Sequence, residues 1–178
     1  GWIAPADCTE VRVSLSESER MVYAVAEFDD RYRLAAHAPA KTRVVRRLLA
    51  KHDGEQTLII GQYLDQLEEL SASLEAPLVT GKTPVKERER LFEAFRTGEV
   101  TTLVVSKVAN FSVDLPEATV AIQVSGTFGS RQEEAQRLGR VLRPKSDGRT
   151  AHFYTIVTRE TVDADFAAKR QRFLAEQG

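Results

Sequence analysis

Short runs of β-branched and apolar residues alternate along this chain with longer stretches of helical spacing, and this alternation constrains its fold most. The runs lie at residues 57–60, 77–79, 101–105, 119–124 and 150–157. Strands this apolar are typically buried on both faces of a parallel sheet. The alternation therefore predicts an α/β fold, a doubly wound parallel β-sheet with helices on both faces. Such sheets bind ligands at the carboxyl ends of their strands, so we expect functional residues just after the strands.

The stretches between the runs repeat apolar residues every three or four positions, which predicts one buried face for each helix. The residues on these faces are Leu64, Leu67 and Leu70, and then Leu91, Phe92 and Phe95. Gly98 follows the second stretch, where a helix end favours a residue that accepts a positive φ.

The first forty residues have a different pattern. Ser16 to Glu19 has the sequence of a capping box, which starts a helix. An alternating, strand-like segment precedes it and a helical stripe follows Pro39; their apolar residues are Val11, Val13 and Leu15, and Val44, Val45, Leu48 and Leu49. We expect residues 1–40 to form an entry segment packed on the main domain, and residues 41–178 to form that domain.

Composition excludes several classes of protein. The 178 residues carry 25 Lys and Arg against 26 Asp and Glu, so bulk electrostatic capture of nucleic acid is not indicated. The single Cys8 excludes an internal disulfide framework, and His37, His52 and His152 lack the spacing of metal ligands, so we expect no metal site. No apolar run is long enough to cross a membrane. The chain opens with Gly1, so we expect a piece of a longer protein.

Residues 76–83, A-P-L-V-T-G-K-T, come within one residue of the phosphate-binding pattern G-x-x-x-x-G-K-[ST]. In that loop the Lys and Thr lie in the first helical turn. Here Pro84 follows directly, which favours a helix that begins at Pro84 with Thr83 as its N-cap and Lys82 outside it. Two hypotheses remain: a phosphate loop built on Gly81, Lys82 and Thr83, or a loop that meets some other phosphate, such as a nucleic-acid backbone.

Residues 129–144 predict a helix that carries arginines on a polar face. A capping-box sequence starts it at Ser130 and Pro144 ends it. Gln136, Arg140 and Arg143 follow one another at about one helical turn, and Gly139 permits close approach of a ligand or backbone beside Arg140. Two such arginines can stabilise charge that develops during phosphoryl transfer. The alternative is a solvated helix whose arginines pair with surface acids.

These residues carry a family resemblance. The sequence Q-R-L-G-R-V-L-R at 136–143 matches Q-x-x-G-R-x-x-R, the last signature motif of superfamily 2 helicases. Residues 106–116 resemble the preceding motif, residues 58–63 the opening strand of the second motor domain, and residues 81–88 its G-x-x-x-x-x-x-R element. Segments 111–118, 129–143 and 169–174 resemble the XPB-type DNA repair helicases in particular. The resemblance covers residues 55–176 approximately.

The resemblance implies the second RecA-like motor domain of such a helicase, which has the P-loop NTPase fold but no phosphate loop of its own. Arg140 and Arg143 would be arginine fingers that reach ATP on the first motor domain, with Gln136 supporting the phosphate contact. Three further residues would lie at the nucleotide: Asp114, Gly139 and Ser112, the last standing where many relatives have glycine.

The same resemblance implies contacts with the DNA backbone. The residues expected to make them are Ser106, Lys107, Gly81, Lys82, Thr83 and Gln62. ATP and Mg²⁺ would be bound mainly by the N-terminal motor domain, so we expect the isolated chain to be inactive. The implied activity is ATP-dependent 3′–5′ helicase or translocase action in nucleotide excision repair. It would take place in the cytoplasm at the nucleoid of a prokaryote, or in a eukaryotic nucleus.

The implied partners are DNA, the N-terminal helicase motor domain of the same protein, and a repair nuclease or a transcription and repair factor; no membrane is expected. Two other functions compete with this one. A stand-alone P-loop phosphotransferase would require Lys82 for ATP binding by this chain. A non-catalytic RecA-like domain that binds a partner protein would leave Arg140 and Arg143 dispensable.

Overall fold

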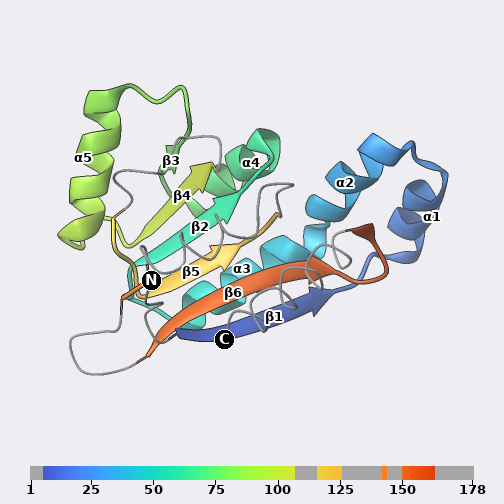
Figure 1. Cartoon of the computed structure of the whole chain (residues 1–178), viewed down its shortest axis with the longest axis horizontal. Helices are drawn as coiled ribbons and strands as arrows, with labels where there is room; N and C mark the ends of the chain where they lie inside the picture. Colours follow the sequence, from blue (N-terminus) through green and yellow to red (C-terminus); the bar gives the residue numbers. More distant parts are fainter. Residues whose placement is uncertain (1–5, 107–115, 126–141, 144–149, 163–178) are drawn as a thin grey trace, which may run out of the picture.

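The computed structural model describes residues 6–106, 116–125, 142–143 and 150–162. These residues form one six-stranded sheet with the strand order β1-β6-β5-β2-β4-β3, and every pair of neighbours is parallel (Figure 1). The strands are β1 (Ala6–Val13), β2 (Thr57–Gly61), β3 (Leu78–Val79), β4 (Thr102–Ser106), β5 (Val120–Gln123) and β6 (Ala151–Thr158). The five apolar runs of the sequence supply β2 to β6, so the predicted parallel sheet is confirmed.

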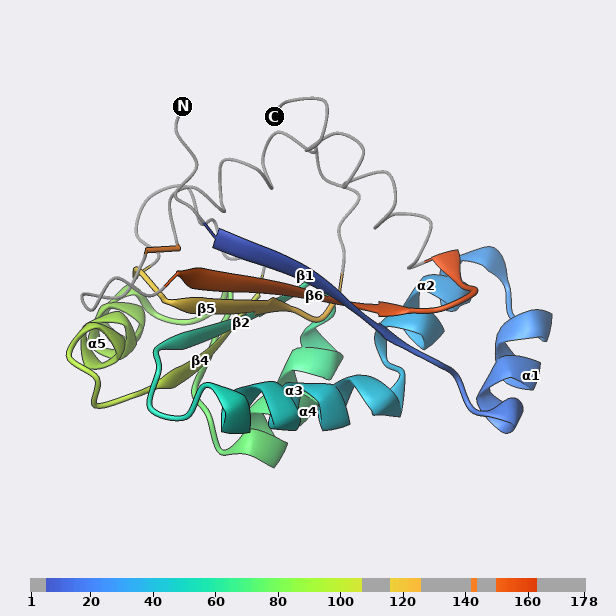
Figure 2. The same ribbon diagram turned by 90° about the horizontal axis from the view of Figure 1, so that it is seen from below.

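Helices cover both faces of the sheet. They are α1 (Glu17–Val25), α2 (Phe28–Ala36), α3 (Pro39–Lys51), α4 (Leu64–Leu74) and α5 (Val85–Arg96). Helices α3 and α4 lie together beneath the sheet in Figure 2. They share a core with Ile59 of β2, whereas Leu58 and Ile60 face the core that contains Phe95 of α5. Because successive strand residues point to opposite faces, β2 is buried on both and reads as a continuous apolar run.

The residues expected to form an entry segment supply part of the same sheet. β1 pairs with β6 from Ala6 opposite Ala151 to Val13 opposite Thr158, and it forms the sheet edge. Ser16 then caps α1 in the predicted capping box with Glu19. Helices α1 and α2 lie beyond the carboxyl ends of β1 and β6 (Figures 1 and 2). A domain boundary at residue 40 stays a prediction.

The start of α5 differs from the prediction by one residue. The helix begins at Val85, and Pro84 is its N-cap, with φ −57° and ψ 145°. Thr83 is not the cap, because the first hydrogen bond of the helix runs from Arg88 N–H to the Pro84 carbonyl at 2.9 Å, and the Thr83 hydroxyl accepts from Thr80 N–H at 2.9 Å instead. The predicted position of Lys82 outside the helix is confirmed. At the other end of α5, Gly98 has the predicted positive φ, +84°.

Candidate functional site at the carboxyl edge of the sheet

Parallel strands end at one common edge, and several predicted site residues lie there. Gln62 follows β2, Ser106 ends β4 opposite Gly61, and residues 81–83 follow β3. Because β3, β4, β2 and β5 are adjacent in that order, these residues form one continuous rim. We call this rim, from residues 80–83 through Ser106 and Gln62 to Ser125, the carboxyl edge.

The loop after β3 is closed by its own threonines. Thr80 N–H donates to the Thr83 hydroxyl, Lys82 N–H donates to the Thr80 hydroxyl at 3.1 Å, and Thr83 N–H donates to the Thr80 carbonyl at 3.2 Å. These three amides are therefore used within the turn, whereas a phosphate loop directs its amides at the nucleotide. The Lys82 side chain is exposed. This geometry disfavours the phosphate-loop hypothesis and leaves Lys82 as a cation at the carboxyl edge.

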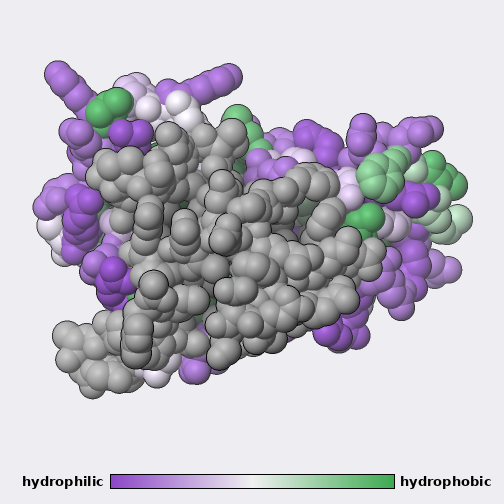
Figure 3. Space-filling view, in the orientation of Figure 1, coloured by the Kyte–Doolittle hydropathy of each residue, from purple (hydrophilic) through white to green (hydrophobic). Residues whose placement is uncertain are grey.

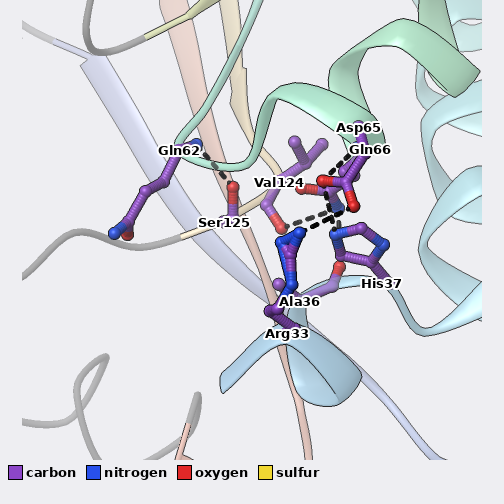
Figure 4. Close-up of polar contacts among 8 residues, drawn as sticks. All are labelled: Arg33, Ala36, His37, Gln62, Asp65, Gln66, Val124 and Ser125. Atoms are coloured by element: carbon purple, nitrogen blue, oxygen red, sulfur yellow. Dashed lines mark hydrogen bonds and ion pairs between the residues drawn. The ribbon is translucent and has the colours of Figure 1, made fainter. Parts of the chain in front are cut away.

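Gly61 lets the ends of β2 and β5 approach closely. The backbone N–H of Gln62 donates to the Ser125 hydroxyl at 2.7 Å. A Cβ atom at Gly61 would lie 2.8 Å from Ser125 Oγ and 2.8 Å from Leu67 Cδ2, so no larger residue fits without a shift. Figure 4 shows the Gln62 side chain extending away from this contact. The Gln62 backbone is thus fixed while its side chain can meet a ligand.

Sequence reasoning missed a buried polar cluster behind the carboxyl edge. Lys41 of α3 is only 2% exposed, and its ammonium group donates to the Val124 carbonyl at 2.7 Å. Gln66 of α4 is 5% exposed and donates to the Ala36 carbonyl at 2.6 Å (Figure 4). One signal was present: Lys41 falls on the same helical face as the apolar Val45 and Leu48, at spacings of four and seven residues.

His37 lies beside this cluster at the end of α2. Its Nε2 atom is 3.3 Å from Oδ1 of Asp65 but makes no hydrogen bond, and its ring packs edge-on against Tyr63. Burial lowers the pKa of His37, the Asp65 carboxylate opposes that shift, and Arg33 adds to it. The uncharged imidazole is therefore the form that this environment favours near neutral pH.

Arg143 lies at the amino edge of the sheet, where the strands begin, opposite the carboxyl edge. Its backbone N–H donates to the carbonyl of Ala118, which precedes β5, and its guanidinium pairs with Glu117 at 3.2 Å. It is thus separated from Gln62, Ser106 and residues 81–83. The chain leaves β5 at the carboxyl edge and must return to the amino edge before the parallel strand β6, which explains this position.

The remaining predicted site residues lie outside the described part of the chain. They are Lys107, Ser112, Asp114, Gln136, Gly139 and Arg140. Their predicted roles at the nucleotide and the DNA stay predictions. Among the described residues, no group of three His, Cys, Asp or Glu side chains is arranged to hold a metal ion. His52 makes a structural contact: its Nε2 atom lies 2.7 Å from the Tyr154 hydroxyl.

A second surface feature lies on α1 and α2. Figure 3 shows apolar side chains gathered at that end of the molecule. The exposed large hydrophobic residues in these helices are Met21, Val22, Val25 and Phe28. Within the described ranges, no helix is long and apolar enough to cross a membrane.

Comparison with known proteins gives a consistent result. The family model for the ERCC3/RAD25/XPB C-terminal helicase matches residues 1–178. A Kineococcus radiotolerans protein named DNA 3'-5' helicase XPB is 68% identical over 178 residues, which are 100% of this chain and 32% of that protein. A Drosophila melanogaster protein named General transcription and DNA repair factor IIH helicase/translocase subunit XPB is 36% identical over 185 residues, 100% of this chain and 23% of that protein. The chain thus spans at most about a third of these relatives.

The fold also matches a solved structure. The C-terminal domain of the DEAD-box protein Dbp5 superposes with a TM-score of 0.72, covering 97% of this chain and 87% of that one. The two sequences are 15% identical, so this likeness bears on the fold alone. It confirms the predicted RecA-like architecture, with helices on both faces of a parallel sheet.

Proposed function

The chain belongs to the ERCC3/RAD25/XPB C-terminal helicase family, and from this premise we propose that it is the second motor domain of an ATP-dependent 3′–5′ DNA helicase or translocase. Its part in that reaction is to hold the DNA backbone and to supply arginines to ATP bound on a preceding motor domain. The setting we propose is nucleotide excision repair, together with DNA and a repair nuclease or a transcription and repair factor. The name of the Drosophila melanogaster relative, a subunit of a general transcription and DNA repair factor, supports the repair and transcription parts of this setting.

The carboxyl edge carries the DNA part of the proposal. It presents the exposed Lys82 and the Gln62 side chain along one rim, whereas Ser106 at the end of β4 is 1% exposed. Phosphate contacts from lysines, amides and hydroxyls position a protein on DNA without reading its sequence. A translocase needs contacts of this kind, since it must hold any sequence that it moves along.

The ATP part of the proposal rests on Arg140 and Arg143. ATP and Mg²⁺ would be bound mainly by the preceding motor domain, and the arginines would stabilise charge on the transferred phosphoryl group. Arg143 is paired with Glu117 and its side chain is 42% exposed. Exposed ion pairs of this type contribute little free energy, so a nucleotide phosphate can replace the Glu117 carboxylate as its partner.

DNA binding by this chain tests the assignment of the carboxyl edge. We expect Lys82→Ala and Gln62→Ala to weaken binding to a DNA duplex, measured by fluorescence anisotropy at low salt. The matched control is Lys51→Ala, because Lys51 is also exposed but ends α3 beside His52, at the amino edge. Loss of one phosphate contact at Lys82 should also lower the salt dependence of log Kd by about 0.9. Equal effects of Lys82→Ala and Lys51→Ala would contradict the assignment.

A further inference from the structure

A buried cation lies directly behind the carboxyl edge. Lys41 stands in the first turn of α3, on the face that also buries Val45 and Leu48. It is among the largest fully buried side chains of the described residues. Burying an ammonium group is costly, and an apolar residue of similar shape often serves stability as well or better. Packing therefore does not explain a lysine here, and the hydrogen bond that its ammonium group donates to the Val124 carbonyl becomes relevant.

Two hydrogen bonds, joined by the neighbouring residues Val124 and Ser125, connect Lys41 to Gln62. The ammonium group donates to the carbonyl of Val124 at 2.7 Å, just after β5 ends. The next residue, Ser125, accepts the hydrogen bond from Gln62 N–H at 2.7 Å. Figure 4 shows the second of these hydrogen bonds, with Val124 and Ser125 side by side at the strand end and Gln62 facing them.

The surroundings make this path stiff. Gly61 leaves no room between β2 and Ser125, and the Gln66 amide also approaches the Val124 carbonyl, at 3.5 Å. Ser125 itself is 1% exposed. Close-packed interiors transmit small displacements, and the Val124 carbonyl belongs to the peptide unit directly before Ser125.

We propose that Lys41 is a positioning residue, which holds the Val124 carbonyl and thereby fixes Ser125 and the backbone of Gln62 at the carboxyl edge. Gln62 is then presented to the DNA backbone in one orientation. The DNA readout of this inference rests on the proposed function, whereas the path from Lys41 to Gln62 does not.

Amide hydrogen exchange tests the path without DNA. In the Lys41→Met variant of this chain we expect the Gln62 N–H to exchange about tenfold faster or more, because its acceptor is displaced. Val45→Ala is the control for stability, since Val45 lies one turn along the same buried face and is 0% exposed. It should lower the melting temperature without selectively accelerating exchange at Gln62. Unchanged exchange at Gln62 in Lys41→Met would overturn the inference.

DNA affinity tests the consequence. Lys41→Met should weaken duplex binding roughly tenfold, as expected when a hydrogen bond to a charged phosphate is lost. Binding is measured below the onset of unfolding of every variant. Lys51→Met controls for the loss of one positive charge and should change affinity much less. If Val45→Ala weakens binding as much as Lys41→Met does, the role of Lys41 is structural and the inference fails.

Ser125→Ala tests the second step of the path even if Lys41→Met folds poorly, and together with a folded Lys41→Met variant it forms a double-mutant cycle. Ser125→Ala removes the acceptor of the Gln62 N–H and should itself accelerate exchange at Gln62 and weaken DNA binding. Because both changes act through one path, their effects on DNA affinity should not add. Fully additive effects would overturn the path. If the unaltered chain binds no DNA, the proposed function fails, and exchange at Gln62 still decides whether Lys41 positions that residue.

Discussion

Replacing Gly61 by alanine is expected to destabilise the chain through crowding at one defined point. The added Cβ would lie 2.8 Å from both Leu67 Cδ2 and Ser125 Oγ, and 3.0 Å from Val124 Cγ2. Leu67 is fully buried, so its side chain cannot move into solvent. If Ser125 turns away instead, Gln62 N–H loses its acceptor. Overpacking of this kind costs about 1–3 kcal/mol.

Urea unfolding followed by circular dichroism measures this cost. In a chain of this length each kcal/mol corresponds to a fall in melting temperature of roughly 2–4 °C. The contact with Ser125 is isolated by repeating Gly61→Ala in a Ser125→Ala background, where the hydroxyl is absent. There the penalty should be smaller by at least about 0.5 kcal/mol. A penalty below about 0.5 kcal/mol, or equal penalties in both backgrounds, would refute the reasoning.

Two further predictions concern pH and catalysis. Burial lowers the pKa of His37, so the unfolded chain binds a proton at His37 more readily than the folded chain does. The free energy of unfolding should therefore fall as pH drops below 6.5, the ordinary pKa of histidine. His37→Asn should reduce this slope in urea titrations on either side of that pH, and an unchanged slope would exclude His37 as its source. Arg140→Ala in the full-length protein should reduce ATP turnover by about 10³-fold or more with the fold intact. Unchanged turnover by folded Arg140→Ala protein would favour the non-catalytic, partner-binding alternative.

The core of the sheet was predictable because burial on both faces leaves a strong pattern in the sequence. β2 and β4 read as continuous apolar runs, and their side chains are almost wholly buried on either face. Gly98 and the capping box at Ser16 were predictable for a different reason. A positive φ and a reciprocal cap each require particular residues at particular positions, so local sequence is sufficient.

Pairing partners and burial of polar groups were less predictable. The strand-like pattern near Val11 gave no indication that β1 would join the sheet beside β6, because that pairing depends on residues far away in the chain. Lys41 lies on the helical face that buries Val45 and Leu48, but its local sequence does not predict the distant Val124 carbonyl to which its ammonium group donates. The cap of α5 is Pro84, whose carbonyl accepts the first hydrogen bond of the helix from Arg88 N–H, while the Thr83 hydroxyl belongs to the preceding turn.

The candidate site was predictable in part. The family resemblance pointed to Gln62, Ser106 and Lys82, and the structure confirms that they lie at the rim that the carboxyl-edge rule predicts for parallel strands, while their roles stay predictions. The carboxyl-edge rule does not apply to Arg143, which lies at the amino edge, where the chain returns before β6. The three-residue spacing between Arg140 and Arg143 therefore does not predict at which edge of the sheet either arginine lies.

Hydrolysis of ATP by this purified chain, with and without DNA, tests the central claim most directly, with Lys82→Ala as the control. A second motor domain that completes a nucleotide site on another domain should show no turnover above background while folded, and Lys82→Ala should change nothing. Turnover that disappears in Lys82→Ala would contradict the account, because it would make residues 81–83 a phosphate loop that serves this chain alone.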